Sequence, residues 1–328
     1  MTVTDASRVS GGGPGWYRGD CHVHSLHSSG GELTPQQLSV AARAAGLDFI
    51  VGTEHNTAEA HETWRALNRD DLLVLLGQEV VTRDGHWLAL GLTPGQLIGW
   101  NYDTAEDALK QQLAEVHRVG GLCVAAHPYA PYPTGTFQHP YQDFDVIEVW
   151  NGPWTSDVPW QADNEAALAE WARSLATDVP TGRWRPAIGN SDTHLHGQIA
   201  IPHTVVAADQ CTADALFEGI RAGRSWIAES AHVHVTFSAS ASGRVAGIGE
   251  RLTTNGDSVV VRAEIRGVPS GVVTFHTQNG AVHTDTLPAT GSGTVQWLAN
   301  APESTFVRIE VRHPSGYMAA LMNPIVLI

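Results

Sequence analysis

The chain has 328 residues, a length that suits two domains, and its 42% hydrophobic and 16% charged residues are typical of a folded protein. Nineteen Lys and Arg against 34 Asp and Glu give a net charge of −15. This balance argues against nucleic acid or an anionic membrane as the main partner, because both require a dense positive surface. No apolar run reaches the roughly 18 residues needed to span a bilayer.

Residues 1–18 are rich in Gly and Ser and predict a flexible arm. They lack the apolar segment of a signal peptide, so the expected location is the cytoplasm, with export left open if a leader has been removed. The three cysteines, Cys21, Cys123 and Cys211, are far apart and odd in number. They predict small buried side chains rather than a disulfide framework or a CxxC zinc site.

Between residues 19 and 231, short apolar runs that end in polar residues alternate with helical patterns. The apolar runs are 47–55, 72–80, 121–128, 144–151 and 185–194, and the helical patterns are 34–46, 104–121 and 162–176. The first helix has Thr34 as its N-cap, Pro35 at its first position, Gln37 two residues later and Gly46 at its end. Strands alternating with helices predict a parallel sheet with crossover helices, as in a β/α barrel with its chemistry at the strand ends.

From residue 232 to 328 the pattern changes to period-two alternation interrupted by Gly, Pro, Asn and Ser. The alternating segments are 233–243, 257–271, 272–280, 294–300 and 305–316. This pattern predicts a small antiparallel β-sandwich. No chemistry is evident in it, and it is open whether this region covers the barrel, builds a homo-oligomer or recognises part of a substrate.

The strongest single motif is Asp20-Cys21-His22-Val23-His24. In a strand, residues two apart share a face, so the imidazoles of His22 and His24 point the same way. Two neutral imidazole nitrogens on one face suit a divalent cation. Two exposed strand histidines would show the same spacing, so the motif needs support from the rest of the chain.

That support comes from the ends of the later apolar runs, where metal-ligating residue types recur. The runs end in Thr53-Glu54-His55-Asn56, in Glu79 with His86 following, in His127-Pro128, in Glu148 and Asn151, and in Asn190-Ser191-Asp192-Thr193-His194. A single polar residue at a strand end is usually solvated, but five such coincidences at one predicted edge of a sheet indicate a metal centre.

These motifs resemble those of the PHP (polymerase and histidinol phosphatase) family of metal-dependent hydrolases. The family pattern appears as DCHVH, TEH, Glu79, AHP and SDTH, in order, over residues 19–231. The resemblance implies a distorted (β/α)7 barrel, here followed by the β-sandwich, that binds two or three Zn, Mn or Fe ions. The ligands that it implies are His22, His24, His55, Glu79, His127, Asp192 and His194.

The chain departs from the family pattern at two positions. Ser29 stands where an Asp near the metals is frequent, which puts a third ion in doubt, with His27 close enough in sequence to substitute. Glu54 stands where Asp is usual. The segments around His86 and Glu148 and the C-terminal β region look closer to the carbaryl-hydrolase-like branch of the family than to its histidinol-phosphatase or polymerase-associated members. His86 is either a ligand, an acid or base, or a structural residue.

The function implied is hydrolysis of a small organic substrate by a metal-activated water. The expected bond is a phosphoester, with a carbamate or carboxylic ester as the alternative and a non-catalytic metal- or ligand-binding module as the alternative from another class. His194, His86 and Glu54 are candidates for proton transfer to the leaving group, and Asp20 for orienting an imidazole. Asn151, Trp150 and Arg83 are candidates for substrate binding.

The substrate class is left open because no metal motif contains Arg or Lys, which usually hold phosphate oxygens. Several tryptophans lie near the expected loop ends, namely Trp87, Trp100, Trp150, Trp154, Trp160 and Trp184. Most are expected to pack in the core. If several instead line the mouth, an aromatic or apolar substrate is favoured.

Overall fold

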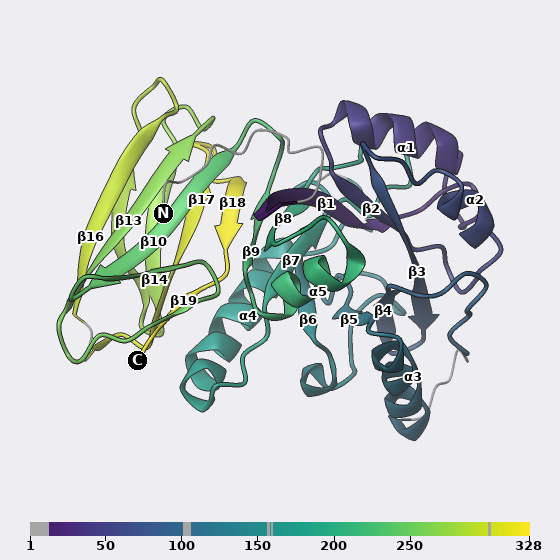
Figure 1. Ribbon diagram of the computed structural model, residues 1–328, viewed down its shortest axis with the longest axis horizontal. Coiled ribbons are helices and arrows are strands. Elements are labelled where there is room, and N and C mark those ends of the chain that lie inside the picture. The colour runs from purple at the N-terminus through teal and green to yellow at the C-terminus, as the bar shows by residue number, and fades with distance from the viewer. Residues whose placement is uncertain (1–12, 101–105, 156–157, 159, 301–302) are drawn as a thin grey trace.

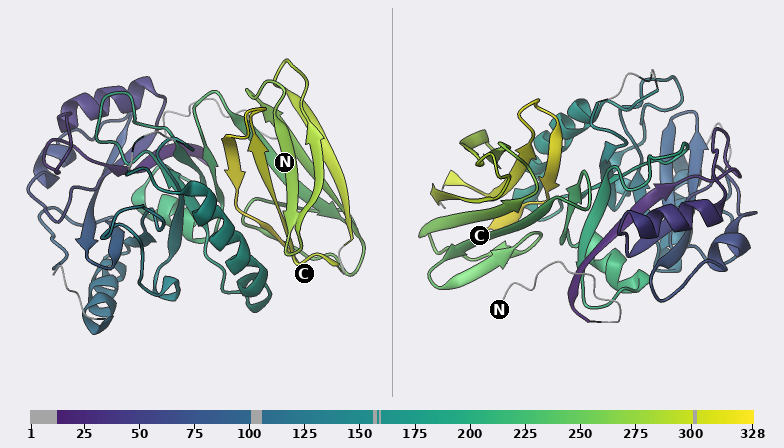
Figure 2. Two further views of the ribbon diagram at one scale, coloured as in Figure 1. Left: turned by 180° about the vertical axis from the view of Figure 1, so that it is seen from behind. Right: turned by 90° about the horizontal axis from the view of Figure 1, so that it is seen from above.

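The computed structural model describes residues 13–100, 106–155, 158, 160–300 and 303–328. Two lobes lie side by side, an α/β lobe that contains the N-terminal strands and a β-rich lobe formed by the C-terminal third (Figures 1 and 2). Among the described residues, none of the helices has both the length and the apolar character needed to cross a bilayer.

The α/β lobe is built around a curled sheet. Its strands are β1 (Gly15–Val23), β2 (Phe49–Gly52), β3 (Leu73–Thr82), β4 (Gly85–Leu90), β5 (Leu122–Ala125), β6 (Val146–Asn151), β7 (Ala187–Asn190), β8 (His203–Ala208) and β9 (Ser225–Ala228). Its helices are α1 (Pro35–Ala44), α2 (His61–Arg65), α3 (Glu106–Arg118), α4 (Asn164–Asp178) and α5 (Ala213–Arg221), with 3-10 turns η1 (Tyr141–Asp143) and η2 (Val179–Thr181).

The sheet curls so that its strand ends converge. Strands β1 to β7 follow one another in sheet order, and an isolated bridge between Val23 and Thr193 brings the end of β7 back to the end of β1. The amide of Cys21 also donates to the side chain of Asn190, at 2.9 Å. The polar residues in or just after the last part of β1, β2, β3, β5 and β7 therefore meet on one side of the lobe.

The strand–helix alternation predicted a parallel sheet, but the sheet contains both parallel and antiparallel pairs. β4 runs antiparallel to both β3 and β5, and β8 and β9 add further antiparallel pairs. β4 follows β3 through the tight turn Thr82-Arg83-Asp84-Gly85, in which Gly85 has φ +110° and Thr82 donates its hydroxyl to the Gly85 carbonyl. A turn of this kind reverses the chain directly, so no crossover helix separates the two strands.

Helix α1 begins as the sequence predicted. Thr34 caps it, with its hydroxyl accepting from the amide of Gln37 while the Gln37 side chain accepts from the amide of Thr34, and Pro35 occupies the first turn. Such reciprocal capping satisfies two amides that a helix start leaves unpaired. Gly46, with φ +81°, ends the turn after the helix. The prediction for this element is confirmed.

The β-rich lobe contains two sheets. Strands β10 (His234–Ala241), β11 (Arg244–Gly247), β13 (Ser258–Arg266) and β16 (Gly293–Asn300) form the separate sheet. Strands β12 (Arg251–Leu252), β14 (Val272–Thr277), β15 (Gly280–Thr286), β17 (Phe306–Arg312), β18 (Met318–Met322) and β19 (Ile325–Leu327) belong to the same long sheet as β1 to β9.

One apolar core joins these two sheets of the β-rich lobe. It includes Phe237 and Val261 from the separate sheet and Phe275 and Ile309 from the long one, all buried. Burying each such side chain contributes about 1.5–3 kcal/mol relative to leaving it exposed. The long sheet continues into the α/β lobe, because β18 pairs antiparallel with β9. The two lobes thus share a backbone hydrogen-bond ladder as well as a side-chain interface.

Candidate metal centre

His22 lies in β1 and His24 directly after it, and both side chains are fully buried. Their ring centroids are 4.9 Å apart. β1 lies between β2 and β8, so its backbone is fixed on both sides. The two imidazoles reach the same region of the strand-end face, as expected for residues two apart in a strand.

Glu79, in β3, lies at the centre of the histidines. Its Oε2 is 3.3 Å from Nε2 of His22, 3.2 Å from Nε2 of His24 and 3.0 Å from Nε2 of His55. Its Oε1 is 2.8 Å from Nδ1 of His86 and 3.0 Å from Nε2 of His127. One buried carboxylate therefore faces five imidazoles from four different segments of the chain.

Asp192 closes the other side of the cluster. Its Oδ1 lies 3.3 Å from Nε2 of His22, 3.2 Å from Nε2 of His24 and 3.4 Å from Nδ1 of His194. Asp192 and His127 both have positive φ, +49° and +25°, a backbone region that non-glycine residues rarely adopt. Two candidate ligands are therefore held in costly backbone conformations that the surrounding structure must support.

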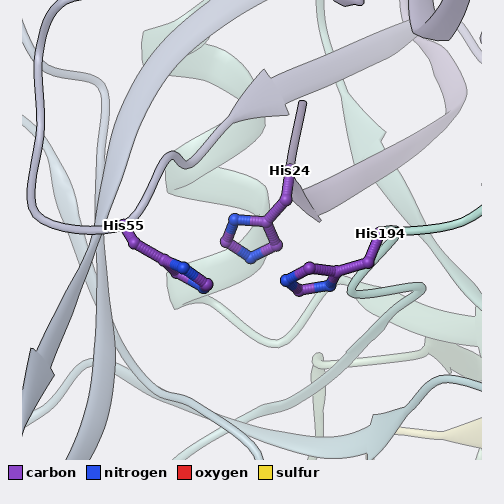
Figure 3. A group of neighbouring side chains, drawn as sticks. All are labelled: His24, His55 and His194. Carbon is purple, nitrogen blue, oxygen red and sulfur yellow. The ribbon is translucent and has the colours of Figure 1, made fainter. Parts of the chain in front are cut away.

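His24, His55 and His194 form a further group whose rings face one another (Figure 3). The ring centroids of His24 and His55, and of His24 and His194, are 4.4 Å apart. Nδ1 of His194 lies 3.0 Å from the carbonyl oxygen of Asp192, which can only accept, so this nitrogen carries the proton. Nε2 of His194 then has a free lone pair.

A second layer of residues orients these imidazoles. The carboxylate of Glu148, fully buried in β6, lies 3.1 Å from Nδ1 of His22 and accepts from the amide of His127 and from the side chains of Asn151 and Asn190. With Nδ1 of His22 donating to Glu148, Nε2 is the atom that faces Glu79 and Asp192. A carboxylate behind a ligating histidine fixes both its tautomer and its orientation.

Glu54 belongs to this second layer and does not line the pocket. Its carboxylate accepts from the hydroxyls of Ser25 and Ser28 and from the indole of Trp64. Ser28 in turn contacts Nδ1 of His24 at 3.1 Å and accepts from the amide of His55 at 2.9 Å. Glu54 therefore holds the serine that positions two of the histidines.

The cluster fits divalent cations. Nε2 of His22, Nε2 of His24 and Oδ1 of Asp192 are buried. Oδ1 lies 3.2–3.3 Å from both nitrogens, yet none of the three atoms makes a hydrogen bond of acceptable geometry with a described residue. Atoms in this state are rare in folded proteins and call for an explanation such as an ion. Ligands bound at about 2.1 Å lie about 2.9–3.4 Å from one another in octahedral or tetrahedral geometry. The distances from Oε2 of Glu79 and Oδ1 of Asp192 to the imidazole nitrogens, 3.0–3.4 Å, fall in this range.

Three overlapping groups of possible ligands can be drawn from the cluster. They are His22, Glu79 and His127; His24, His55 and His194; and His22, His24 and Asp192. An imidazole nitrogen has one lone pair and binds one ion, so groups that share a histidine compete. The first two groups share no residue and can be filled together. The third would share His22 with the first and His24 with the second.

Without cations, protons compensate the charge of the carboxylates. Burial disfavours the charged form of His22, but Asp192, Glu148 and Glu79 outweigh it and raise the pKa of His22 well above its usual value. Burial likewise disfavours the ionised form of Glu79, yet His22 and the other imidazoles around it hold its pKa well below the usual range. The site therefore strongly favours positive charge next to Glu79 and Asp192.

A pocket of about 350 Å³ opens onto the cluster. His55, Glu79, His86, His127, Asp192 and His194 line its floor, and the walls are formed by Gly30, Tyr132, Asn151, Gly152, Pro153, Val158, Trp160, Gln161, Ser191, Leu195 and Gln198. Among the described residues, no Arg or Lys contributes to it. Its walls are largely apolar and amide-bearing, and any positive charge would come from the cluster itself.

The structure gathers the seven residues that were predicted as ligands, together with His86, and Asn151 lines the pocket as well. Trp150 and Arg83 lie elsewhere. The indole of Trp150 is buried and donates to the carbonyl of Gly152, while Arg83 is exposed on the turn between β3 and β4. The structure describes all six tryptophans that lie near the expected loop ends. Of these six, only Trp160 lines the pocket.

Sequence reasoning did not single out Tyr132, Gln161 or Gln198 of the pocket wall, which lie in loops without a motif. Glu148 was noted at the end of its apolar run without a role, and this place among the polar run ends was the available signal. His27 and Ser29 are exposed and belong to none of the ligand groups.

No protein-family model matches the chain. An uncharacterised protein of Methanocaldococcus jannaschii is 25% identical over 146 residues, which cover 41% of this chain and 81% of that protein.

Two solved structures resemble parts of the chain. One is a presumed metal-dependent phosphoesterase from Bifidobacterium adolescentis, with a TM-score of 0.38 and 21% identity over 61% of this chain and 94% of that one. The other is a lesion-specific endonuclease from Pyrococcus furiosus, with a TM-score of 0.43 and 17% identity over 64% of this chain and 56% of that one. Both TM-scores are below 0.5, a level of likeness that carries no functional conclusion.

Proposed function

We propose that this protein is a metal-dependent hydrolase of the PHP type that cleaves a phosphoester in a small organic substrate. The observation that carries the proposal is Glu79, a buried carboxylate that faces five imidazoles at the floor of a pocket. His22, Glu79 and His127 would hold one cation and His24, His55 and His194 a second, and Asp192 lies next to His22 of the first group and His24 of the second. Divalent cations at such sites supply Lewis-acid chemistry, lowering the pKa of water and neutralising charge that develops on oxygen.

Other residues of the pocket would transfer protons and contact the substrate. His86 donates from Nδ1 to Glu79, which leaves the lone pair of its buried Nε2 without a partner among the described residues, and burial lowers the pKa of His86, which keeps it neutral. Because His86 lines the pocket, this nitrogen would be its proton acceptor there. His194, in this proposal, is a ligand rather than a proton donor. Tyr132 and Trp160 offer ring surfaces for the organic part of the substrate, and Asn151 and Gln161 offer amides.

One observation favours a second candidate, the hydrolysis of a carbamate or carboxylic ester by the same centre. A phosphomonoester carries two negative charges, and the described pocket residues include no Arg or Lys to bind its outer oxygens. A phosphodiester or a neutral ester places less charge against the pocket walls.

The two candidates are separated by assaying p-nitrophenyl phosphate, bis(p-nitrophenyl) phosphate, 1-naphthyl acetate and 1-naphthyl methylcarbamate with Mn²⁺ and with Zn²⁺. Metal-dependent turnover of either phosphate supports the first candidate. Cleavage of the naphthyl substrates alone replaces it with the second. Stoichiometric metal without turnover of any of the four would favour a non-catalytic binding module.

A further inference from the structure

The wall of the pocket that follows β6 is built from Asn151, Gly152 and Pro153, which line the pocket, and from Trp154 behind them. Its first residue also touches the cluster, because the side-chain amide of Asn151 donates to Glu148 at 3.1 Å and to Asp192 at 3.2 Å. The position of this short loop therefore sets both the shape of the pocket and a contact to a candidate ligand.

The first two residues of helix α4 hold the loop through hydrogen bonds. Asn164, buried at its first position, accepts from the amide of Asn151 at 2.9 Å and donates to the carbonyls of Asn151, Pro153 and Trp154. The next residue, Glu165, accepts from the indole nitrogen of Trp154 at 2.8 Å. Two consecutive side chains at the start of α4 thus hold the backbone and the tryptophan of the loop.

The C-terminal β-rich lobe also contacts the loop and the start of α4, through Arg312. Arg312, at the end of β17, donates to both carboxylate oxygens of Glu165, at 2.6 and 3.1 Å, and its guanidinium lies over the ring of Trp154, 5.2 Å from the centroid. Trp154 packs edge-on against Trp150, with 5.1 Å between ring centroids. A planar guanidinium that both pairs and stacks constrains its partners more than a point charge does.

Arg312 is itself held by a charged stripe along β17. Arg308, Glu310 and Arg312 are two residues apart on one face of β17, and the two arginines of this face contact α4. Glu310 accepts from Arg308 at 2.8 Å and from Arg312 at 3.1 and 3.2 Å, and Arg308 lies over the ring of Trp171 in α4. Arg308 and Glu310 are buried and Arg312 is half-buried, so these charges hold Arg312 in place and do not form a solvent-exposed face.

We infer that Arg312 is a positioning residue for the pocket, and that the β-rich lobe acts on the site by holding the loop 151–154 through Trp154 and Glu165. This assigns a role to a lobe that carries no candidate catalytic residue. The inference depends on the proposed function only for its kinetic readout.

The test compares Arg312→Ala and Glu165→Gln with Arg262→Ala, which removes an arginine that pairs with Glu264 on the separate sheet of the same lobe. Glu165→Gln keeps the size of the side chain and removes the charge that Arg312 contacts. All four proteins, wild type included, are loaded with the same metal and examined by hydrogen exchange. The amides of Asn151, Gly152 and Trp154 are expected to exchange about tenfold faster in the first two variants, because the local opening free energy falls, while β1 peptides and the control stay unchanged.

On a substrate that the wild type cleaves, Arg312→Ala and Glu165→Gln are expected to raise KM about three- to tenfold with kcat within about twofold, because the loop places the substrate and not the reacting water. Arg312→Lys keeps the charge without the stacking plane and should recover part of the loss. Unchanged exchange of residues 151–154 in both variants would overturn the inference, even if the wild type is an active hydrolase. An inactive wild type with faster exchange in both variants would leave the inference standing and overturn the proposed function.

Discussion

The Nδ1 atom of His22 lies 3.1 Å from Oε1 of Glu148, and both side chains are fully buried. This contact turns the other nitrogen of His22 toward Glu79 and Asp192, so that a residue outside the candidate ligand set decides which atom binds. Replacing Glu148 with Gln keeps the size of the side chain and removes its charge. We expect this change to lower metal affinity about 10- to 100-fold, the usual cost of losing such a partner.

Competition with a fluorescent chelator measures this affinity. Glu218→Gln is the matched control, because Glu218 is an exposed carboxylate that pairs with Arg224 away from the cluster. Equal affinities of Glu148→Gln and the wild type would show that the second layer does not tune the site.

Removal of both His22 and His24 tests the centre itself. The double variant His22→Ala with His24→Ala deletes one ligand from each of the two independent groups. We expect bound metal to fall below one ion per chain and any hydrolysis to disappear, while circular dichroism stays that of a folded protein. His27→Ala is the control, since His27 is exposed beside the same motif. Full metal content in the double variant would refute the assignment.

For Glu54 we predict a role in stability and not in catalysis. Burial disfavours its charged form, but His24 and the donors from Ser25, Ser28 and Trp64 lower its pKa, so it accepts hydrogen bonds and does not carry a proton to give away. Glu54→Gln replaces an acceptor with a donor that faces other donors. We expect it to cost about 1–3 kcal/mol in the free energy of unfolding, the penalty for a buried unsatisfied group.

The catalytic effect of Glu54→Gln is expected to be small at temperatures where the variant is folded, once rates are corrected for bound metal. Urea unfolding and metal-normalised kcat provide the two measurements. A loss of kcat above about 100-fold with unchanged stability would restore the role in proton transfer that the sequence suggested, since general acids contribute about 100- to 10,000-fold.

The candidate ligands could be predicted from the sequence because each sits at a strand end within a short motif, and curling of the sheet brings strand ends together. The roles of the two carboxylates were harder to predict. Glu54 and Glu79 both end apolar runs and both become buried. Only the structure separates them, because Ser25, Ser28 and Trp64 enclose one while imidazoles surround the other.

The parts that could not be predicted depend on contacts between distant segments. The turn signal at Arg83-Asp84-Gly85 was present, but the regular strand–helix alternation on either side favoured a parallel sheet. In the C-terminal lobe, alternation places Arg308, Glu310 and Arg312 on one face without saying what covers it. That face packs on α4, more than 130 positions earlier in the chain.

His203 provides a prediction about pH that is independent of the metal cluster. It is fully buried, its Nδ1 lies 3.0 Å from the carbonyl of Ala200, and its Nε2 lies 2.8 Å from the guanidinium of Arg18. The carbonyl and the guanidinium fix a neutral ring that donates from Nδ1 and accepts at Nε2. Burial and the neighbouring Arg18 lower the pKa of His203 from 6.5 to about 3.

Well above pH 6.5 the folded and unfolded chains both keep His203 neutral, so it adds no pH dependence there. As the pH falls below 6.5, the unfolded chain binds a proton that the folded chain excludes until about pH 3, and stability decreases across this window. His203→Gln preserves a donor and an acceptor but does not titrate. We expect it to flatten the decrease of the free energy of unfolding between pH 6.5 and 4, measured by urea denaturation of chelator-treated protein so that the metal does not contribute. The exposed His196→Gln should retain the full slope of the wild type, and a wild-type slope in His203→Gln as well would show that other groups set the acid sensitivity.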